Sequence, residues 1–389
     1  SFFIQDLEQV AFSLFVKRNK MRVLHIIPSL EFGGAERLAF DISNELSIRN
    51  DIEIKLITFQ GLNDFGERYF INHIPTSIKL SIYDKNQFDV SKLQNEIESF
   101  APHIIHSHLF LAEIVSRSCL YPKAKWFSHF HDNMPQLAKF KLKDLNSKSS
   151  ITNYYEKQYL FNRYCKNGGN RFIAISQDAS QYASSVLPTN AKIYYLKNAI
   201  NYEAFFSPIK RLDRNLPVQL INVGSFQKKK NQQFLVDVLK LLVERNVNCT
   251  LVCLGDGAEI KIVKDKVAKY GLENRVSFKG NVGDVKQQLD QSNIYVHSAY
   301  YEPFGLVLLE AMAAGLPVVC LNGGGNADII EDGTNGFMLE DAIPTRYAQR
   351  IEELVSNQEL YNAIATKGQQ TAKQYGIKKY CDQLVELYE

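Results

Sequence analysis

The most informative stretch of the sequence is Glu302-Pro303-Phe304-Gly305-Leu306-Val307-Leu308-Leu309-Glu310-Ala311-Met312-Ala313-Ala314-Gly315, in which a helix-like apolar run begins near a Pro and a Gly. Pro suits a first helical turn, and Gly lets backbone approach a ligand closely. The free N–H groups and the positive dipole end of such a helix face any anion in front of it. At 1.5 Å per residue, Glu310 lies roughly 7–8 Å along the axis from a start near Gly305. One carboxylate therefore stands at the N-terminus of the helix and the other more than one turn further along it. This spacing suits a ligand in which a phosphate is flanked by two hydroxyl-rich rings.

A plainer interpretation makes Glu302 a solvated cap and Glu310 an exposed helix charge. Against it, Glu310 stands in an apolar run where few exposed positions are available. Burying a bare charge is very costly. We therefore expect Glu310 to be paired or ligand-bound.

Composition narrows the class of protein. The 389 residues are 45% hydrophobic and 22% charged, which predicts a soluble globular chain of two or three domains. A formal net charge of +3 is too small at this size to indicate nucleic-acid binding. The six cysteines form no CxxC pair, and Cys249, Cys253 and Cys320 stand in apolar runs, which predicts reduced, cytoplasmic usage. No uncharged apolar run reaches the roughly 18 residues of a transmembrane helix.

Residues 1–20 precede the segment Met21-Arg22-Val23-Leu24-His25-Ile26-Ile27, which looks like a native start. The extension is apolar but carries Asp6 and Glu8 and ends on basic residues, so it is a poor secretory signal. We expect a vector-derived or mis-started extension, and an amphipathic surface anchor is the alternative.

After Met21, short β-branched runs alternate with longer helix-like runs, which predicts parallel sheets with helices on both faces. The first series of predicted strands covers 23–27, 52–59, 78–83, 104–106, 125–130, 172–175 and 193–196, with helices at 35–47 and 90–100. The second series covers 218–224, 250–254, 276–278, 294–296, 318–321 and 336–339, with helices at 234–244, 258–270, 305–314 and 346–355.

The sequence thus predicts an α/β chain of two Rossmann-like, doubly wound domains with a cleft between them. The expected divisions are an extension (1–20), a first domain (21–200), a linker (201–217), a second domain (218–370) and a C-terminal helix that packs back on the first domain (371–389). The linker is indicated by Pro208, Pro217 and mixed charge without a clear period. Every candidate motif follows a strand, where ligands bind in such sheets.

Two motifs belong to the first domain. Gly33-Gly34 opens the first helix and can bring backbone N–H groups to a phosphate or sugar; a tight βα turn is the alternative. The pair matches neither the GxGxxG motif nor the Walker motif, which argues against nucleotide binding of those two types.

His106 and His108 end one strand, and His129-Phe130-His131-Asp132 ends another. Residues i and i+2 of a strand face one side, so four imidazoles could meet at one metal ion. Because no acidic or Cys ligand is spaced with them, we favour a histidine that lines the cleft and predict no metal.

The second domain has three loops of interest after its strands. The run Gly224-Ser225-Phe226-Gln227-Lys228-Lys229-Lys230-Asn231 puts lysines where they could neutralise a pyrophosphate; a solvated charge run is the alternative. Gly255-Asp256-Gly257 and Gly323-Gly324-Gly325-Asn326-Ala327-Asp328 are two further tight turns.

In the first domain, residues 123–171 carry ten Lys and Arg against three acidic residues, with aromatic residues between them. That surface suits an anionic lipid interface or a phosphate-bearing acceptor, or else a solvated helix pair.

From Met21 onward the chain resembles the retaining glycosyltransferases of the GT-B fold, family 4, also named glycosyl transferases group 1. The strongest match is the Glu-x7-Glu segment from Glu302 to Glu310 with the run that follows it. The supporting matches are Gly33-Gly34-Ala35-Glu36, Ala174-Ile175-Ser176, Lys197-Asn198, Gly255-Asp256-Gly257, Gly324-Gly325 and Asp332-Gly333-Thr334-Asn335-Gly336.

The resemblance implies a nucleotide-sugar donor held mainly by the second domain, without a cofactor or a metal. It implies three catalytic residues, His131, Glu302 and Lys230, of which Lys230 matches the family's pyrophosphate lysine. Glu310 would accept both ribose hydroxyls. The implied donor-binding residues are Gly33, Gly34, Gly224, Ser225, Lys230, Gly255, Asp256, Phe304, Gly305, Leu306 and Glu310. The acceptor side would hold His108, His131 and Asp132.

The chain departs from the family pattern at two positions. Ser225 stands where the family usually has Arg, and the loss of a bidentate phosphate clamp is not conservative. Lys228 or Lys229 would have to replace it as a point charge. Asp328 stands where Glu is usual, which shortens a contact near the donor.

The implied reaction is transfer of a hexosyl unit, from a UDP-sugar by preference, to a glycan or lipid-linked acceptor in bacterial surface polysaccharide or lipopolysaccharide synthesis. The expected location is cytoplasmic, with peripheral contact to an anionic inner membrane face and no nucleic-acid partner. Two alternatives stay open: a catalytically silent sugar-nucleotide-binding subunit, which Ser225 suggests, and an enzyme like the nucleotide-sugar 2-epimerases.

Overall fold

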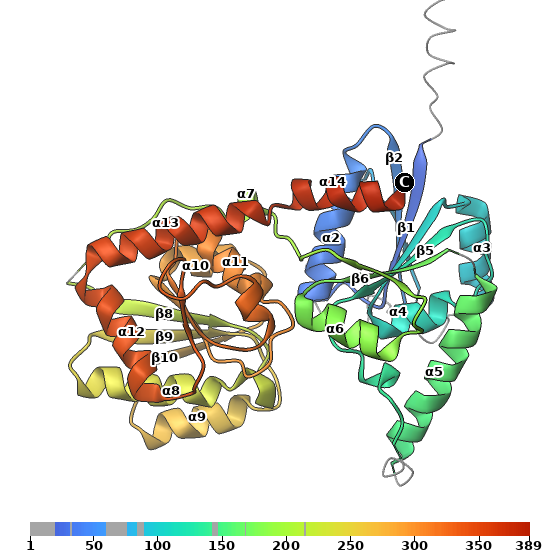
Figure 1. Cartoon of the computed structure of the whole chain (residues 1–389). Helices are drawn as coiled ribbons and strands as arrows, with labels where there is room; N and C mark the ends of the chain where they lie inside the picture. Colours follow the sequence, from blue (N-terminus) through green and yellow to red (C-terminus); the bar gives the residue numbers. More distant parts are fainter. Residues whose placement is uncertain are drawn as a thin grey trace, which may run out of the picture. The chain divides into compact units, whose positions relative to one another are not determined.

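The computed structural model describes residues 20–389 except 32, 60–75, 84–88, 142–146, 168 and 214, so the expectation for the N-terminal extension lies outside the described residues. The chain forms two compact units (Figure 1). The first holds the described residues up to Ile173, Ala183–Tyr194 and Leu384–Glu389. The second holds Ala174–Tyr182 and Tyr195–Gln383.

A seven-stranded sheet forms the centre of the first unit, in the order β3-β2-β1-β4-β5-β6-β7. Its strands are β1 (Met21–Ile27), β2 (Ile52–Thr58), β3 (Lys79–Ile82), β4 (Ile104–His108), β5 (Lys125–Phe130), β6 (Asn170–Ala174) and β7 (Lys192–Tyr195). Neighbours from β3 through β5 pair in parallel. The helices between the strands are α2 (Gly34–Ser47), α3 (Val90–Phe100), α4 (Leu109–Ser116), η2 (Pro135–Leu137), α5 (Lys148–Lys166) and α6 (Gln177–Val186).

The two faces of the first sheet differ in chemistry. Leu24, Ile105 and Trp126 lie on one face and join the hydrophobic core formed with α3. Because successive strand residues point to opposite faces, their neighbours His25 and His106 lie on the other face, where they stand side by side in the register of β1 and β4. One face of this sheet is therefore apolar and the other carries imidazoles.

The second unit is built on a six-stranded parallel sheet in the order β10-β9-β8-β11-β12-β13. Its strands are β8 (Val218–Val223), β9 (Cys249–Leu254), β10 (Val276–Gly280), β11 (Ile294–His297), β12 (Val318–Leu321) and β13 (Phe337–Leu339). Its helices are α7 (Tyr202–Phe205), η4 (Lys228–Lys230), α8 (Gln232–Glu244), α9 (Ile260–Lys269), α10 (Val285–Gln291), α11 (Leu306–Ala313), η5 (Gly325–Asp328), α12 (Pro344–Ser356) and α13 (Gln358–Gln374). Taken in chain order, these strands follow the 3-2-1-4-5-6 arrangement of nucleotide-binding sheets, whose order reverses between β8 and β11.

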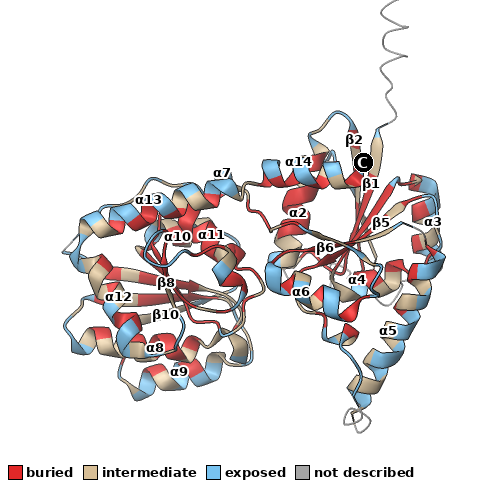
Figure 2. Cartoon of the chain, viewed as in Figure 1, coloured by how far each residue is buried: buried red, intermediate tan, exposed pale blue. Residues whose placement is uncertain are grey.

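The sequence predicted these strands with ends within a few residues, because buried parallel strands are short apolar runs. Figure 2 shows both sheets largely buried and the outer sides of the helices exposed. Cys249, Cys253 and Cys320 are buried and free, as predicted. No bounds were predicted for α4, α5, α6, α7 and α10. Within the described residues, no helix has both the length and the apolar character needed to cross a membrane.

The segments between the units differ from the predicted divisions. Residues 201–217, expected as a linker, are grouped with the second unit. There Nζ of Lys210 donates to the carbonyl of Ser292 at 2.8 Å, and the amide of Ser207 donates to the carbonyl of Ala313 at 3.2 Å. The last helix, α14 (Ile377–Tyr388), begins in the second unit and ends in the first, as predicted for a C-terminal helix that crosses back.

Candidate functional site

Lys230 and Glu302 form the centre of a candidate site in the second unit. Lys230 ends η4, which follows β8, and Glu302 follows β11. Nζ of Lys230 lies 2.6 Å from Oε2 of Glu302, and Nε2 of His297 lies 3.1 Å from the same oxygen. Because β8 and β11 are the strands between which the order reverses, the pair lies where doubly wound sheets bind their ligands.

The Glu302 carboxyl group is ionised over the whole ordinary pH range. Burial alone would raise its pKa, but the neighbouring His297 and Lys230 lower that pKa to about 2. The residue is only 8% exposed. An ammonium group carries three donors, so the contact with Glu302 leaves Lys230 able to donate to a further anion.

The helix N-terminus predicted near Gly305 is observed. Gly305 is the N-cap of α11 in the left-handed conformation, with φ 99° and ψ 51°. A Cβ at Gly305 would lie 2.9 Å from Cδ1 of Leu308 and 3.3 Å from Oδ1 of Asn326. Glu310, in the middle of α11, is 8% exposed, which confirms that it is not a surface charge.

A glycine-rich loop after β12 fixes the backbone of Glu302. The amide of Glu302 donates to the carbonyl of Gly323 at 2.7 Å, and the amide of Gly325 donates to the carbonyl of Glu302 at 2.9 Å. A Cβ at Gly325 would lie 2.3 Å from the carbonyl oxygen of Pro303, so any other residue would push these loops apart. The loops after β11 and β12 therefore form one rigid support.

The loops after β8 and β9 are joined in the same way. A Cβ at Gly255 would lie 2.2 Å from the carbonyl oxygen of Gly224, and one at Gly257 would lie 2.5 Å from that of Phe226. The amide of Phe226 donates to the carbonyl of Asp256 at 2.9 Å. The Asp256 carboxylate accepts from the Gly257 amide at 2.7 Å, which gives it a turn-forming role beside the predicted donor contact.

The lysines and serine after β8 differ in their surroundings. Lys228 is exposed, and Nζ of Lys229 lies 5.3 Å from the ring centre of Tyr301. The carbonyl of Ser225 accepts from Nε2 of Gln232 at 3.0 Å. Lys230 is therefore the lysine of the run that the structure joins to Glu302.

Asp328, the second departure from the family pattern, is held on both its side chain and its backbone. The hydroxyl of Tyr195 donates to Oδ2 at 3.3 Å, and that of Tyr375 donates to the main-chain carbonyl at 2.7 Å. Lys197 donates to the same carbonyl at 3.3 Å.

In the first unit, Gly33 and Gly34 lie as predicted, with Gly33 as the N-cap of α2. Oε2 of Glu36 occupies the space beside Gly33. A Cβ added to Gly33 would lie 2.0 Å from this oxygen. Burial raises the pKa of Glu36 to about 7, and the charge of Glu31 adds to the rise. The carboxyl group in the first turn of α2 therefore loses its proton only near neutral pH.

The structure brings together the predicted acceptor-side histidines. Nδ1 of His108 lies 2.9 Å from Nε2 of His131. His108 ends β4, and Leu109 after it has a φ of 68°, a left-handed conformation that costs about 1–3 kcal/mol for a non-glycine residue. Asp132 accepts from the amide of Asn133 at 2.7 Å.

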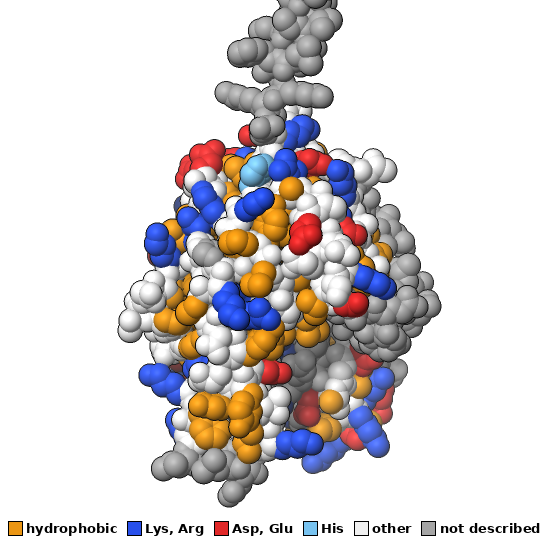
Figure 3. Space-filling model, turned by 90° about the vertical axis from the view of Figure 1, so that its right-hand side faces the viewer, with side chains coloured by type: hydrophobic (Ala, Val, Ile, Leu, Met, Phe, Trp, Pro, Cys, Tyr) orange, Lys and Arg blue, Asp and Glu red, His pale blue; other side chains and the backbone are white. Residues whose placement is uncertain are grey.

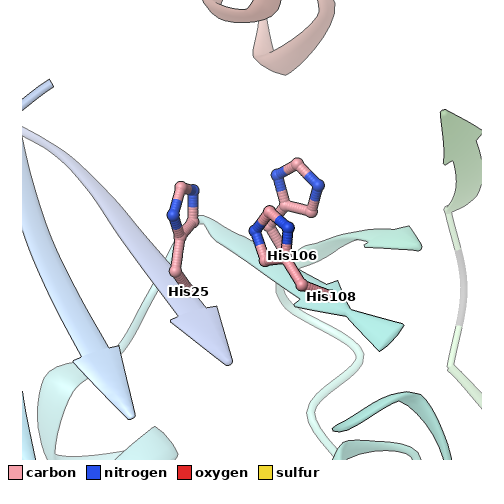
Figure 4. A group of neighbouring side chains, drawn as sticks. All are labelled: His25, His106 and His108. Atoms are coloured by element: carbon pink, nitrogen blue, oxygen red, sulfur yellow. The ribbon is translucent and has the colours of Figure 1, made fainter. Parts of the chain in front are cut away.

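Sequence reasoning missed three residues of these sites. His297 ends β11 and contacts Glu302, and its place after a strand was the available signal. His25 on β1 lies beside His106 and His108, all three rings on one side of the sheet (Figure 4). The hydroxyl of Tyr388 contacts Nε2 of His25 at 3.2 Å and Nδ1 of His106 at 2.6 Å. Tyr388 is 363 and 282 positions from these two residues in the sequence, so no local pattern could have indicated the contacts.

The predicted basic and aromatic surface includes α5. Tyr155 is 67% exposed there, and the rings of Phe140 and Tyr154 are 5.2 Å apart at the surface. On the face that it presents, Figure 3 shows apolar side chains in groups with Lys and Arg between them.

Two family models match the chain. Residues 209–371 match the glycosyl transferases group 1, and residues 32–204 match glycosyltransferase family 4. The chain belongs to the group 1 glycosyltransferases. The match over 32–204 begins after β1 and covers β2 to β7, and the match over 209–371 covers all six strands of the second sheet.

Relatives of this glycosyltransferase extend over the whole described chain. An uncharacterized glycosyltransferase of Methanocaldococcus jannaschii is 25% identical over 378 residues, 95% of this chain and 98% of the relative. HepE of Anabaena, solved with UDP and glucose, has a TM-score of 0.75 at 20% identity, over 94% of this chain and 99% of that one. The lipopolysaccharide outer core galactosyltransferase WaaB has a TM-score of 0.65 at 18% identity, over 94% and 98%. The predicted GT-B fold is confirmed.

Proposed function

We propose that this glycosyltransferase moves a hexosyl unit from a UDP-sugar, with retention of configuration and without using a metal ion, to a glycan or lipid-linked acceptor of a bacterial surface polysaccharide. The observation that carries the proposal is the Lys230–Glu302 contact of 2.6 Å at the strand-order reversal of the second sheet, in front of α11.

The donor would lie along α11. The first-turn N–H groups and the positive end of the helix face its phosphates. Lys230, which has donors beyond the one that Glu302 uses, neutralises diphosphate charge. Glu310 lies more than a turn deeper and accepts the two ribose hydroxyls, a role that suits a buried carboxylate.

The chemical step is mainly electrostatic. The bond between the anomeric carbon and the β-phosphate oxygen breaks, and its electron pair leaves with the diphosphate. Lys230 and the helix N–H groups stabilise that charge as an oxocarbenium-like sugar forms. The acceptor oxygen attacks the same face and passes its proton to the leaving phosphate oxygen. With Ser225 in place of an arginine, Lys228 or Lys229 supplies the remaining positive charge as a point charge.

The choices of nucleotide and acceptor rest on the relatives and on the first unit. HepE was solved with UDP and glucose, and WaaB is a lipopolysaccharide enzyme, which supports UDP and a surface glycan. His131, 7% exposed, would contact the reacting sugar. The lysines and exposed aromatic rings of residues 123–171 would meet the anionic inner face of the membrane.

Nucleotide release from a panel of UDP-, GDP- and ADP-sugars tests the proposal, with thermal stabilisation by each donor measured in parallel. We expect UDP release and stabilisation by UDP-sugars. Stabilisation without release or transfer, whatever the acceptor, would favour the silent subunit that Ser225 suggests. Conversion of the donor sugar without an acceptor would favour the epimerase.

Glu310→Ala separates donor binding from general damage. It should lower donor affinity at least tenfold by titration, because the ribose hydroxyls lose their acceptor. The matched control is Glu273→Ala at an exposed glutamate of the same unit, which should bind the donor as the parent does. Unchanged affinity in Glu310→Ala would remove Glu310 from the donor site.

A further inference from the structure

Five buried histidines gather on the imidazole-bearing face of the first sheet. His25 comes from β1, His106 and His108 from β4, and His129 and His131 from β5 and the residue after it. In register, His25 stands beside His106, and His108 beside His129. The rings of His129 and His131 stack with centres 4.1 Å apart, and those of His106 and His108 stack at 4.4 Å.

Three of these residues, His108, His129 and His131, leave several ring nitrogens without a protein partner. Nε2 of His108, Nδ1 of His131 and both nitrogens of His129 are buried and make no hydrogen bond among the described residues. A buried polar atom without a partner costs about 1–3 kcal/mol. Either nitrogen of His129 can therefore bind an ion without breaking a hydrogen bond among the described residues.

The three rings can supply ligand atoms to one ion. One nitrogen from each lies within 4.8 Å of one from each of the others. Nδ1 of His108 and Nε2 of His131 are already 2.9 Å apart, near the roughly 3.3 Å between ligand atoms of a tetrahedral ion with bonds of about 2.0–2.1 Å. An ion between those two nitrogens would replace their single hydrogen bond with two metal bonds. Nitrogen ligands of this kind suit zinc and the neighbouring divalent transition metals.

One of the three rings reaches solvent. His131 is 7% exposed and His108 and His129 are 1% or less, so solvent reaches the cluster at His131. That side leaves a fourth position for water.

The neighbouring group His25, His106 and His108 is a weaker candidate, although its ligand atoms are also within 4.8 Å (Figure 4). Nδ1 of His25 contacts Oγ of Ser43 at 3.0 Å, and its Nε2 contacts the Tyr388 hydroxyl at 3.2 Å. Both nitrogens of His25 are therefore used.

We propose that His108, His129 and His131 form a binding site for one divalent transition metal ion of the zinc class, with water as the fourth ligand. This reverses the absence of a metal predicted from the sequence. The site shares His131 with the proposed reacting centre, so His131 would contact the reacting sugar in the metal-free protein, and no transfer step uses the ion.

Zinc titration of the tag-free full-length protein after dialysis against a chelator tests the proposal. We expect one equivalent bound with a Kd of about 1 μM or tighter. Cobalt(II) in place of zinc should give the intense visible absorption of a four-coordinate ion. A titration that saturates at no defined stoichiometry, or not below about 100 μM, would overturn the site.

Two variants locate the ligands. His129→Gln should weaken zinc binding roughly 100-fold, while His25→Gln, which removes a buried histidine of the same face, should stay within threefold of the parent. Equal losses in the two variants, or a loss only in His25→Gln, would overturn the assignment. If His129→Gln does not fold, His129→Cys keeps a ligand atom and should bind zinc with a changed cobalt spectrum; an unchanged spectrum would exclude His129.

Measuring both UDP release and zinc binding on the chelated protein distinguishes a failure of the metal site from a failure of the proposed donor site. Donor-dependent UDP release by the chelated protein would uphold the donor site whether or not zinc binds. Zinc binding without UDP release would uphold the metal site alone.

Discussion

Nζ of Lys230 lies 2.6 Å from Oε2 of Glu302, although the two residues are 72 positions apart in the chain. The contact joins the loops after β8 and β11, the two central strands between which the order of the second sheet reverses. We propose that this mostly buried cation and carboxylate bind a phosphate group, since the ammonium group has donors beyond the one that Glu302 uses. The predictions below start from this pair.

Replacing Lys230 with Met should abolish turnover and weaken donor binding, because the diphosphate loses its buried cation. The fold should lose about 2–4 kcal/mol, since the buried Glu302 carboxylate would keep its contact with His297 but lose its ammonium partner. Turnover assays and denaturant titrations measure the two effects.

A double variant separates stability from function. Lys230→Met with Glu302→Gln should recover much of the lost stability but none of the turnover, because the buried carboxylate that lost its ammonium partner is gone while the phosphate cation is still missing. Lys228→Met, at an exposed lysine of the same run, is the stability control. Additive losses in the double variant would show that the pair is not coupled.

Gly325→Ala should destabilise the protein by about 2 kcal/mol or more and lower turnover, because its Cβ would lie 2.3 Å from the backbone oxygen of Pro303 and push Glu302 away. Gly271→Ala is the control, since a Cβ there meets nothing within 4 Å. Its φ of 67° limits the loss to about 1 kcal/mol and should leave turnover unchanged. Equal effects at both sites would argue against the loop support.

Glu36→Gln should make stability less dependent on pH. A carboxyl group whose pKa is raised from 4.5 to about 7 on folding holds a proton that the unfolded chain has released, so stability falls as pH rises from about 4.5 to about 7. The variant should therefore be more stable than the parent at pH 8 by roughly 1–3 kcal/mol, with the difference vanishing near pH 4. Melting curves across this range are the measurement. Ser47→Ala, an uncharged change in the same helix, should shift stability equally at every pH.

Tyr388→Phe should cost about 1–2 kcal/mol, because the ring stays but two buried imidazole nitrogens, on His25 and His106, lose their hydroxyl partner. Chemical denaturation measures the loss. Tyr300→Phe, at a tyrosine that is mostly exposed, should change stability by less than about 0.5 kcal/mol. A Tyr388→Phe variant as stable as the parent would mean that the hydroxyl does not hold the last helix.

His131→Ala should slow transfer while leaving donor affinity near that of the parent, since His131 lies in the first unit and the donor contacts are proposed in the second. Transfer and titration are best measured on chelated protein, so that a metal does not enter the comparison. Unchanged turnover would take His131 out of the reacting centre.

Much of this architecture was predictable because its signals are local. Short apolar runs predicted the buried parallel strands, and the Pro-Phe-Gly sequence predicted the start of α11 at Gly305, where the observed φ of 99° is one that glycine adopts freely. The candidate residues after β8 and β11 were predicted for the same reason, since in doubly wound sheets ligand-binding residues follow strands. The buried state of Glu310 followed from its apolar neighbours.

Other features were not predictable from local patterns. The expected linker at 201–217 is bound to the second unit through backbone carbonyls, such as that of Ser292, which no composition signal marks. The part played by His297 depends on its 3.1 Å approach to Glu302, and that of Gly325 on the carbonyl of Pro303. These contacts arise from loops that follow different strands.

The two doubly wound sheets, the helix N-terminus at Gly305 and the residue types available for a nucleotide-sugar could be predicted without a structure, because strand and helix periodicities extend over a few neighbouring residues. Which of those residues act together depends on tertiary packing. Parallel strands bring the ends of distant segments to one edge, so the Lys230–Glu302 pair, the five-histidine face and the Tyr388 hydroxyl between two imidazoles exist only once the sheets and the last helix have packed.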